Sequence, residues 1–408
     1  MECAAGKWNS TIIFFIFLVT SIYFLHSLLL GHVTVNFDGV TLKSSPELPL
    51  RFRSGEGIFK ILQVADMHYG QGAITRCRDV PSSEFKFCSD LNTTVFLQRL
   101  IEAEKPDFVA FTGDNIFGSS TPDAAESLFQ AFGLAAEYRI PWAAILGNHD
   151  QESTMDREEL MSLISLMDYS VSQVNPMVRD PSGSGEEVFL DRIDGFGNYN
   201  LMVYGAYGSP FANNSVLNLV FLDSGDRFAA NGRGTYGWIR ESQLDWLRGL
   251  TQEQQDEHYW YNYFRGSCFS RKTPTALAFF HIPIPEVRSL YYREIVGEFQ
   301  EAVACSSVNS GVLKTLVSLK NVKAVFIGHD HVNDFCGNLD GVWFCYGGGF
   351  GYHGYGMAGW PRRARVILAE LSKRESTWMG LERIRTWKRL DDEMLSKIDE
   401  QVLWDQGS

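Results

Sequence analysis

The sequence predicts an α/β fold in which strands and helices alternate along the chain and functional residues follow the strand ends. Two observations predict it. Short apolar runs bounded by glycine, asparagine or aspartate are typical of buried strands. The segments between them carry apolar residues at helical spacing, such as Leu97, Leu100 and Ile101. In sheets of this kind, ligands bind beyond the carboxyl ends of the strands.

The apolar runs predict the elements in chain order. Phe59–Ala65 and Asp107–Phe111 are the first two strands, and Pro106 ends the helix between them. The predicted strands are residues 59–65, 107–111, 142–146, 201–204, 217–222, 276–280, 324–327, 342–346 and 365–371. The predicted helices are residues 92–104, 122–138, 157–167, 242–250, 294–304 and 313–319.

These elements predict one main domain over residues 57–371. Residues 32–56 are expected to form an exposed lead-in, with a short strand at Val33–Phe37. Surface loops are expected at residues 179–198 and 251–272, and a turn at Gly234–Gly237.

A helical tail over residues 372–408 is expected to pack on this domain. The apolar residues of the tail stand at roughly helical spacing. They are Met379, Trp387, Leu390 and Met394.

The composition bounds the class of protein. The chain has 408 residues, of which 45% are hydrophobic and 21% charged, so it can bury a full core. Its formal net charge of -13 argues against a nucleic-acid partner, because phosphate backbones bind basic surfaces. A small anionic substrate remains compatible with this charge, because a metal site supplies its own positive charge.

Residues 1–31 are predicted to be a signal peptide or a signal anchor. Thr11–Leu30 is apolar apart from a few serine, threonine and histidine positions, and Lys7 lies upstream. Small residues near Ser21 or Ser27 permit cleavage, which is the favoured interpretation. If it is not cleaved, the stretch is long enough to span a bilayer, and only then is membrane contact expected. Both interpretations place the rest of the chain in the secretory pathway.

The cysteine count agrees with an oxidising compartment. Six cysteines remain after Cys3, and an even number there suggests disulfides. Sequence order suggests the pairs Cys77–Cys88, Cys268–Cys305 and Cys336–Cys345, with free buried thiols as the alternative. Asn92 and Asn213 begin glycosylation acceptor motifs.

One stretch of the chain points to a metal site. Ala324–Ile327 is a predicted buried strand, and Gly328 lets the backbone turn at its end. His329 and His331 follow, and in extended backbone this spacing directs both imidazoles to one side and Asp330 to the other. Converging neutral imidazoles are typical metal ligands, although a solvated turn holding two histidines explains the stretch equally well.

Polar residues that can bind metal also follow four other predicted strands. Seven histidines lie beyond residue 32, and five of them belong to these motifs, a concentration that chance does not explain. The residues at the strand ends are Asp66 and His68, Asp114, Asn148 and His149, His281, and finally His329 and His331. His353 is a weaker candidate for the substrate cleft, with a plain surface-loop histidine as the favoured interpretation.

In that order the motifs read Asp-x-His, Gly-Asp, Gly-Asn-His-Asp, His and Gly-His-x-His. This set resembles the calcineurin-like metallophosphoesterases over about residues 57–371. The sequence around Asp66 and Asp114 is similar to that of the plant and fungal purple acid phosphatases, including those labelled probable inactive. The resemblance implies a sandwich of two mixed β-sheets flanked by helices, in α/β/β/α order.

The resemblance also implies two metal ions, with Fe paired with Zn or Mn as the expected identities. Oxygen and imidazole ligands suit such metals. The implied ligands are Asp114 as the bridge, Asp66, His68 and His331 for one metal, and Asn148, His281 and His329 for the other. His149 is expected to contact the phosphate and the leaving group, and Asp150 to orient it.

Two positions depart from the purple acid phosphatase pattern. That pattern has a tyrosine three residues after the bridging aspartate, where this chain has Phe117. It has a glycine two residues after the first aspartate, where this chain has His68. One ligand is lost and another gained, so the ligand count is kept, and we expect a working site without the purple tyrosinate–iron colour.

The expected function is that of a secreted or lumenal binuclear-metal phosphatase. It would hydrolyse phosphomonoesters by in-line attack of a metal-bound hydroxide. The expected partner is a small phosphorylated substrate or a phosphoprotein, and the expected location is extracellular, in the cell wall or vacuolar. The alternatives are a phosphodiesterase or pyrophosphatase using the same site, and a catalytically silent binding glycoprotein.

Overall fold

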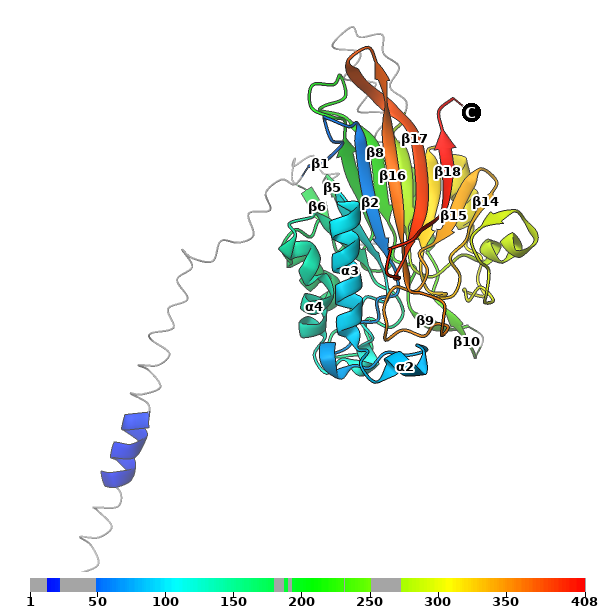
Figure 1. Cartoon of the computed structure of the whole chain (residues 1–408). Helices are drawn as coiled ribbons and strands as arrows, with labels where there is room; N and C mark the ends of the chain where they lie inside the picture. Colours follow the sequence, from blue (N-terminus) through cyan, green and yellow to red (C-terminus); the bar gives the residue numbers. More distant parts are fainter. Residues whose placement is uncertain are drawn as a thin grey trace, which may run out of the picture. The chain divides into compact units, whose positions relative to one another are not determined.

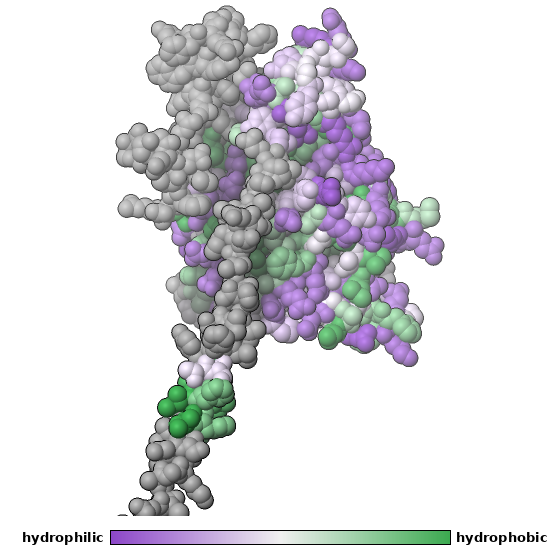
Figure 2. All heavy atoms as spheres, turned by 90° about the vertical axis from the view of Figure 1, so that its left-hand side faces the viewer, coloured by the Kyte–Doolittle hydropathy of each residue, from purple (hydrophilic) through white to green (hydrophobic). Residues whose placement is uncertain are grey.

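The computed structural model describes residues 13–22, 49–179, 187–189, 193–230, 232–250 and 273–407. The chain forms two compact units, Met1–Pro46 and Glu47–Ser408. In the first unit, residues 13–22 form a helix whose apolar side chains are exposed, green in Figure 2. Among the described residues, none of the helices combines the length and apolar character that crossing a bilayer requires. The predicted strand at Val33–Phe37 lies outside the described residues, as does the predicted loop 251–272.

Two mixed sheets form the core of the second unit in the part of the chain that the structure describes (Figure 1). Sheet 1 has the order β1 (Leu50–Arg51), β7 (Tyr199–Tyr204), β8 (Ser215–Phe221), β11 (Thr275–Phe279), β13 (Val322–Ile327), β15 (Val342–Tyr346), β14 (Cys336–Leu339) and β12 (Ile295–Val296). Sheet 2 has the order β18 (Lys397–Asp405), β17 (Thr377–Leu390), β16 (Arg363–Arg374), β2 (Ile58–Val64), β3 (Phe108–Thr112) and β4 (Trp142–Ile145).

In each sheet a block of parallel strands carries the site. In sheet 2, β2, β3 and β4 are parallel neighbours. In sheet 1, β8, β11, β13 and β15 are parallel neighbours. Parallel strands end at the same edge, so each sheet delivers several loops to one place.

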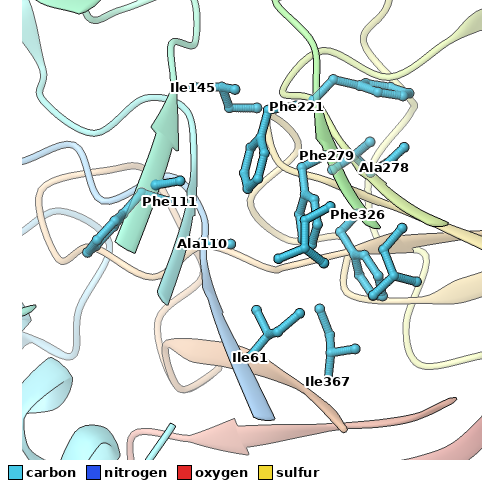
Figure 3. Close-up of a cluster of buried hydrophobic side chains, with 14 of the residues drawn as sticks. Ile61, Ala110, Phe111, Ile145, Phe221, Ala278, Phe279, Phe326 and Ile367 are labelled. Carbon is cyan, nitrogen blue, oxygen red and sulfur yellow. The ribbon is translucent and has the colours of Figure 1, made fainter. Parts of the chain in front are cut away.

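The two sheets pack face to face through aromatic and branched side chains (Figure 3). Phe221, Phe279 and Phe326 stack along neighbouring strands of sheet 1, with ring centroids 4.8 and 5.4 Å apart. Phe108 of sheet 2 meets Phe221 at 6.4 Å between centroids. All four rings are fully buried, and burying such a side chain stabilises the fold by about 1.5–3 kcal/mol.

Helices cover the outer faces of both sheets. The helices are α2 (Ser82–Phe85), α3 (Asp90–Glu104), α4 (Ala124–Glu137), α5 (Arg157–Leu166), residues 241–250 and α7 (Val312–Leu319). On sheet 2, Phe132 of α4 packs on Phe111 and Trp142, with centroids 4.7 and 4.5 Å away. On sheet 1, α7 packs against β13. The predicted two-sheet sandwich flanked by helices is therefore confirmed.

The predicted helical tail over 372–408 is wrong, because these residues complete sheet 2 as β17 and β18. The sequence signal for a strand here is that buried and partly exposed residues alternate with a period of two. Ile384 and Thr386 are fully buried, whereas the alternating Arg383 and Arg385 pair with acidic residues on the neighbouring strands. Strand β16 also runs on to Arg374, so the predicted domain boundary at 371 falls inside a strand.

Two other element predictions are also wrong. Residues 294–304 contain β12 and an irregular loop instead of a helix, because side chains capture its backbone N–H groups. Asn333 Oδ1 accepts from Gln300 N and Glu301 N, and Asp334 Oδ1 accepts from Glu298 N. The predicted turn at 234–237 lies largely in β10 (Arg233–Tyr236), which forms a hairpin with β9 (Arg227–Ala230). A small hairpin of β5 (Met177–Arg179) and β6 (Glu187–Phe189) lies in the predicted surface loop.

The structure forms two of the three expected disulfides, Cys77–Cys88 and Cys336–Cys345. Of the third expected pair, Cys305 carries a free, buried thiol. Its expected partner, Cys268, lies outside the described residues. Both predicted glycosylation acceptors, Asn92 and Asn213, are exposed.

A buried ion cluster ties the two sheets together. Asp334, which precedes β14 of sheet 1, accepts from Arg363 Nη1 of β16 and lies near Lys388 Nζ of β17, both at 2.6 Å. All three side chains are buried, and the two cations lower the pKa of Asp334 against the opposing effect of burial. The carboxylate therefore stays charged inside the fold.

Asp334→Asn should lower the free energy of unfolding by about 3–5 kcal/mol, because it leaves the buried Arg363 guanidinium without a carboxylate and Lys388 with Asp399 alone. Urea unfolding followed by circular dichroism measures this. Glu400→Gln is the matched control: Glu400 pairs with Arg385 and Lys397 on the exposed edge of the same sheet, so the loss should stay below about 1 kcal/mol. Equal losses in the two variants would contradict the account.

Candidate metal centre

The strand ends of both sheets meet at one buried site. The loops after β2, β3 and β4 come from sheet 2, and those after β11 and β13 come from sheet 1. The loops bring together the predicted ligands Asp66, His68, Asp114, Asn148, His281, His329 and His331, all of them buried. Sequence reasoning placed these residues at strand ends, and the sandwich explains why the ends of two separate sheets converge.

One cluster of potential ligand atoms comes from Asp66, His68, Asp114 and His331, whose atoms lie within 4.8 Å of one another. His68 Nε2 lies 2.9 Å from His331 Nε2 and 3.4 Å from Asp114 Oδ2. His331 Nε2 lies 3.5 Å from Asp66 Oδ1. This cluster matches the first predicted ligand set.

A second cluster comes from Asp114, His281 and His329. His281 Nε2 lies 3.3 Å from Asp114 Oδ2, the same oxygen that faces His68 in the first cluster. Asn148, the remaining predicted ligand, is buried, and the backbone N–H of the next residue, His149, donates to Asp114 Oδ1. One carboxylate oxygen thus faces both clusters, which is the position that a bridging ligand requires.

The donor atoms fit metal ions better than they fit one another. Among the described residues, His281 Nε2, His329 Nε2 and Asn148 Oδ1 are buried without a hydrogen-bond partner, and burying such atoms unpaired is costly. Oxygen and imidazole ligands bind a zinc-like ion at about 2.0–2.2 Å, so ligand atoms around one ion lie roughly 3.0–3.5 Å apart. The distances in both clusters have this size, so the site fits two divalent or trivalent cations.

The protonation states also suit metal ligation. Burial lowers the pKa of both His68 and His329 well below the usual range, so these imidazoles stay neutral, the form that binds metal. Burial acts to raise the pKa of Asp114, but His281 and His68 outweigh it and lower that pKa well below its usual range. His281 differs: burial acts to lower its pKa, but the Asp114 carboxylate raises it to about 9, so a metal ion has to displace the Nε2 proton of this imidazole when it binds.

Hydrogen bonds behind the ligands fix which imidazole nitrogen faces the site. His281 Nδ1 lies 2.9 Å from the carbonyl oxygen of Thr112, and His331 Nδ1 lies 2.7 Å from that of Tyr355. A carbonyl accepts only, so each Nδ1 carries the proton and each Nε2 is left for a ligand role. The Tyr355 ring also stacks on His331 at 3.8 Å between centroids.

The backbone is strained at the ligands themselves. Asp66, His68, Asp114 and His329 have φ values of 57°, 46°, 48° and 81°, in the left-handed region that non-glycine residues rarely adopt. Gly113, at φ 90°, packs so closely that a Cβ there would lie 2.5 Å from His281 Nδ1. Such strain persists where the surrounding fold holds it, and it gathers at functional sites.

This strain corrects the prediction of extended backbone after Ile327. His329 and His331 do converge on the site, but the turn at His329 assigns them to different clusters. Asp330 points away, as predicted, and accepts from the Tyr346 hydroxyl at 2.6 Å.

The predicted role of Asp150 is also wrong. Its carboxylate accepts from the backbone N–H groups of Gly147, Asn115 and Ile116 at 2.7–3.0 Å, so it joins the loops after β3 and β4. The side chain that holds His149 is Glu152, whose Oε2 lies 2.9 Å from His149 Nδ1. Sequence reasoning missed Glu152 because it lies beyond the motif.

His149 lies on the open side of the clusters, with 23% of its side chain exposed. Its backbone N–H donates to Asp114 Oδ1 at 2.8 Å, and its ring lies 5.2 Å from that of His68 and 4.7 Å from that of Phe117. Phe117 therefore occupies the position of the missing tyrosine and offers no oxygen. His353 lies behind it, with Nε2 3.1 Å from Ser120 Oγ.

The fold and the buried clusters are those expected of the calcineurin-like phosphoesterases. The family described as calcineurin-like phosphoesterase matches residues 59–333, and the chain belongs to that family, in its purple acid phosphatase-like branch. Members of the family use a site for two metal ions, and the clusters described above have that form.

Comparison with known proteins gives both close and distant relatives. The chain is 60% identical to "Probable inactive purple acid phosphatase 28" of Arabidopsis thaliana, over 99% of this chain and 98% of the relative. It is 33% identical to "Phosphatase DCR2" of Saccharomyces cerevisiae, over 86% of this chain and 57% of the relative. A crystal structure of a dimetal phosphatase from Danio rerio covers 85% of this chain and 99% of its own, at 17% identity and a TM-score of 0.49.

The purified protein should contain close to two metal ions per chain by mass spectrometry. Asp114→Ala should lose both, because it removes the ligand shared by the clusters, whereas His281→Ala should weaken binding at one position by about 100-fold or more. His353→Ala is the control and should keep the full metal content. A protein without bound metal, or an Asp114→Ala variant with unchanged content, would contradict the ligand assignment.

Proposed function

We propose that this protein is a phosphatase of the secretory pathway that hydrolyses phosphomonoesters with two bound metal ions, Fe paired with Zn or Mn. The observation that carries the proposal is the pair of adjoining clusters that share Asp114, together with buried donor atoms that lack a hydrogen-bond partner within the described residues. When bound, two such ions polarise the phosphoryl oxygens and activate water as a nucleophile for in-line displacement.

The residues of the chain provide the rest of the chemistry. Asp114, buried and ionised, holds the two halves of the site together and fixes the backbone of His149. Glu152 holds Nδ1 of His149, and Arg227 Nη2, which can only donate, lies 3.0 Å from Nε2. Nε2 can give a proton to the departing oxygen of the substrate once the substrate replaces this contact with Arg227. The Asp150 carboxylate accepts hydrogen bonds from the backbone N–H groups of Gly147, Asn115 and Ile116. These hydrogen bonds hold the loops after β3 and β4 in position.

The names of the relatives disagree about catalytic activity: one relative is called "probable inactive" and another "phosphatase". The substitutions that separate this chain from the purple acid phosphatase pattern are Phe117 for tyrosine and His68 for glycine. His68 contributes a nitrogen to the first cluster, where the family pattern has no side chain. We therefore attribute the departure to a changed ligand set and not to a lost one.

The proposed location rests on covalent features. Two disulfides are consistent with an oxidising compartment, and the apolar N-terminal stretch fits a secretion signal. We propose that the mature protein is a secreted glycoprotein of the extracellular space, cell wall or vacuole.

Metal-reconstituted protein should hydrolyse aryl phosphates, nucleotides or phosphopeptides, and Asn148→Ala and His281→Ala should each lower kcat/KM by more than about 100-fold without loss of far-ultraviolet circular dichroism. A substrate panel that includes diesters and pyrophosphates identifies the favoured bond. A protein that binds two metals and turns over none of these substrates would overturn the proposal in favour of a silent binding glycoprotein.

The iron-loaded protein should show no tyrosinate-to-iron charge-transfer band in the visible spectrum. The reason is that the phenyl ring of Phe117 lies where the purple pattern has its tyrosine. Absorption spectroscopy on protein of known metal content is the measurement. A strong visible band with two metals bound would show that another tyrosine ligates iron.

A further inference from the structure

The β9–β10 hairpin lies over the second ligand cluster. Its antiparallel register places Arg227 directly opposite Tyr236, so the two side chains share one face of the hairpin. Tyr236 meets His329 edge-on, with ring centroids 4.5 Å apart. Arg227 donates through Nη1 to the carbonyl oxygen of Asn148 at 2.8 Å, and its Nη2 lies 3.0 Å from His149 Nε2. Arg227 thus contacts the loop that holds Asn148 and His149, and Tyr236 contacts His329 of the second cluster.

Hydrogen bonds hold the guanidinium of Arg227 in place without occupying all of its N–H groups. Glu152 Oε1 accepts from Arg227 Nη1 at 2.5 Å, while its other oxygen holds His149. The arginine side chain remains 46% exposed, and its Nε–H has no hydrogen-bond partner within the described residues. The Tyr236 hydroxyl has no hydrogen-bond partner within the described residues, although its ring is packed against a ligand.

The hairpin is anchored, so this placement is fixed in advance. Phe228 packs against Trp238 at 5.0 Å between centroids, and the Arg240 guanidinium lies 3.6 Å from the centroid of the Trp238 ring. Ser307 N donates to Thr235 Oγ1 at 2.9 Å, which ties β10 to the loop between β12 and α7. Donors held in position before binding lose little entropy when a ligand arrives.

We propose that Arg227 and Tyr236 together bind the non-bridging phosphoryl oxygens of the substrate, an inference that rests on the proposed function. Arginine matches phosphate in geometry as well as charge, because its planar N–H groups can pair with two oxygens. Because Glu152 pairs with Arg227, the preference rests on the acceptor oxygens: a phosphomonoester dianion presents three non-bridging oxygens to these donors and a phosphodiester two. Arg227 thus makes the site selective for monoesters.

Binding of inorganic phosphate to the metal-loaded full chain, measured by calorimetry, tests the pair directly. Arg227→Ala should weaken the phosphate Kd by about 10- to 100-fold, and Tyr236→Phe by about 3- to 10-fold, as expected for a charged and a neutral hydrogen bond. Metal content should stay at the level of the unchanged protein in both. Arg233→Ala is the matched control, because Arg233 is exposed at the far end of the same hairpin.

Kinetics then test selectivity. Arg227→Ala should lower kcat/KM for an aryl phosphate monoester at least about 10-fold more than for the corresponding diester, mainly through KM. Unchanged phosphate affinity in Arg227→Ala, with full metal content, would overturn the proposal. Phosphate binding that depends on Arg227 in a protein without turnover would support the pair while overturning the proposed hydrolysis, so the two failures are distinct.

Discussion

The buried carboxylate of Asp114 is the constraint on which the rest of the site depends. Its Oδ2 faces imidazoles of both clusters, and its Oδ1 holds the backbone of His149. A charged carboxylate with 1% exposure is stable only beside positive charge. The loop after β3 must therefore lie against loops of the opposite sheet, and Gly113 permits this approach to His281.

The sandwich meets this requirement by joining its sheets at two levels. Aromatic rings of β3 and β8 fill the space between the sheets, and the ion cluster of Asp334 with Arg363 and Lys388 connects them near β14. These contacts hold the strand ends in place while the ligand residues keep strained backbone angles. Stability built into the core thus offsets strain at the site.

Much of the site could be predicted from the sequence, because a residue at a strand end is located by a local signal. His68 and His281 follow apolar runs, and that alone places them at the edge of a sheet. The roles that depend on contacts between distant loops could not be predicted. Glu152 and Arg227 belong to no motif, and Asp150 seemed to serve His149 although it binds backbone groups that no sequence pattern marks. The helix prediction for residues 372–408 failed because Trp387 and Leu390 stand at helical spacing. The alternation of buried and exposed residues around Ile384, which is typical of a strand, is set by pairing with β16.

The most direct test of the central claim is anomalous diffraction from crystals of the protein grown with its native metals. Our account predicts two strong peaks, one on each side of Asp114 Oδ2, the first beside His68 and the second beside His281. A single peak away from this oxygen, or none in crystals of active protein, would contradict it.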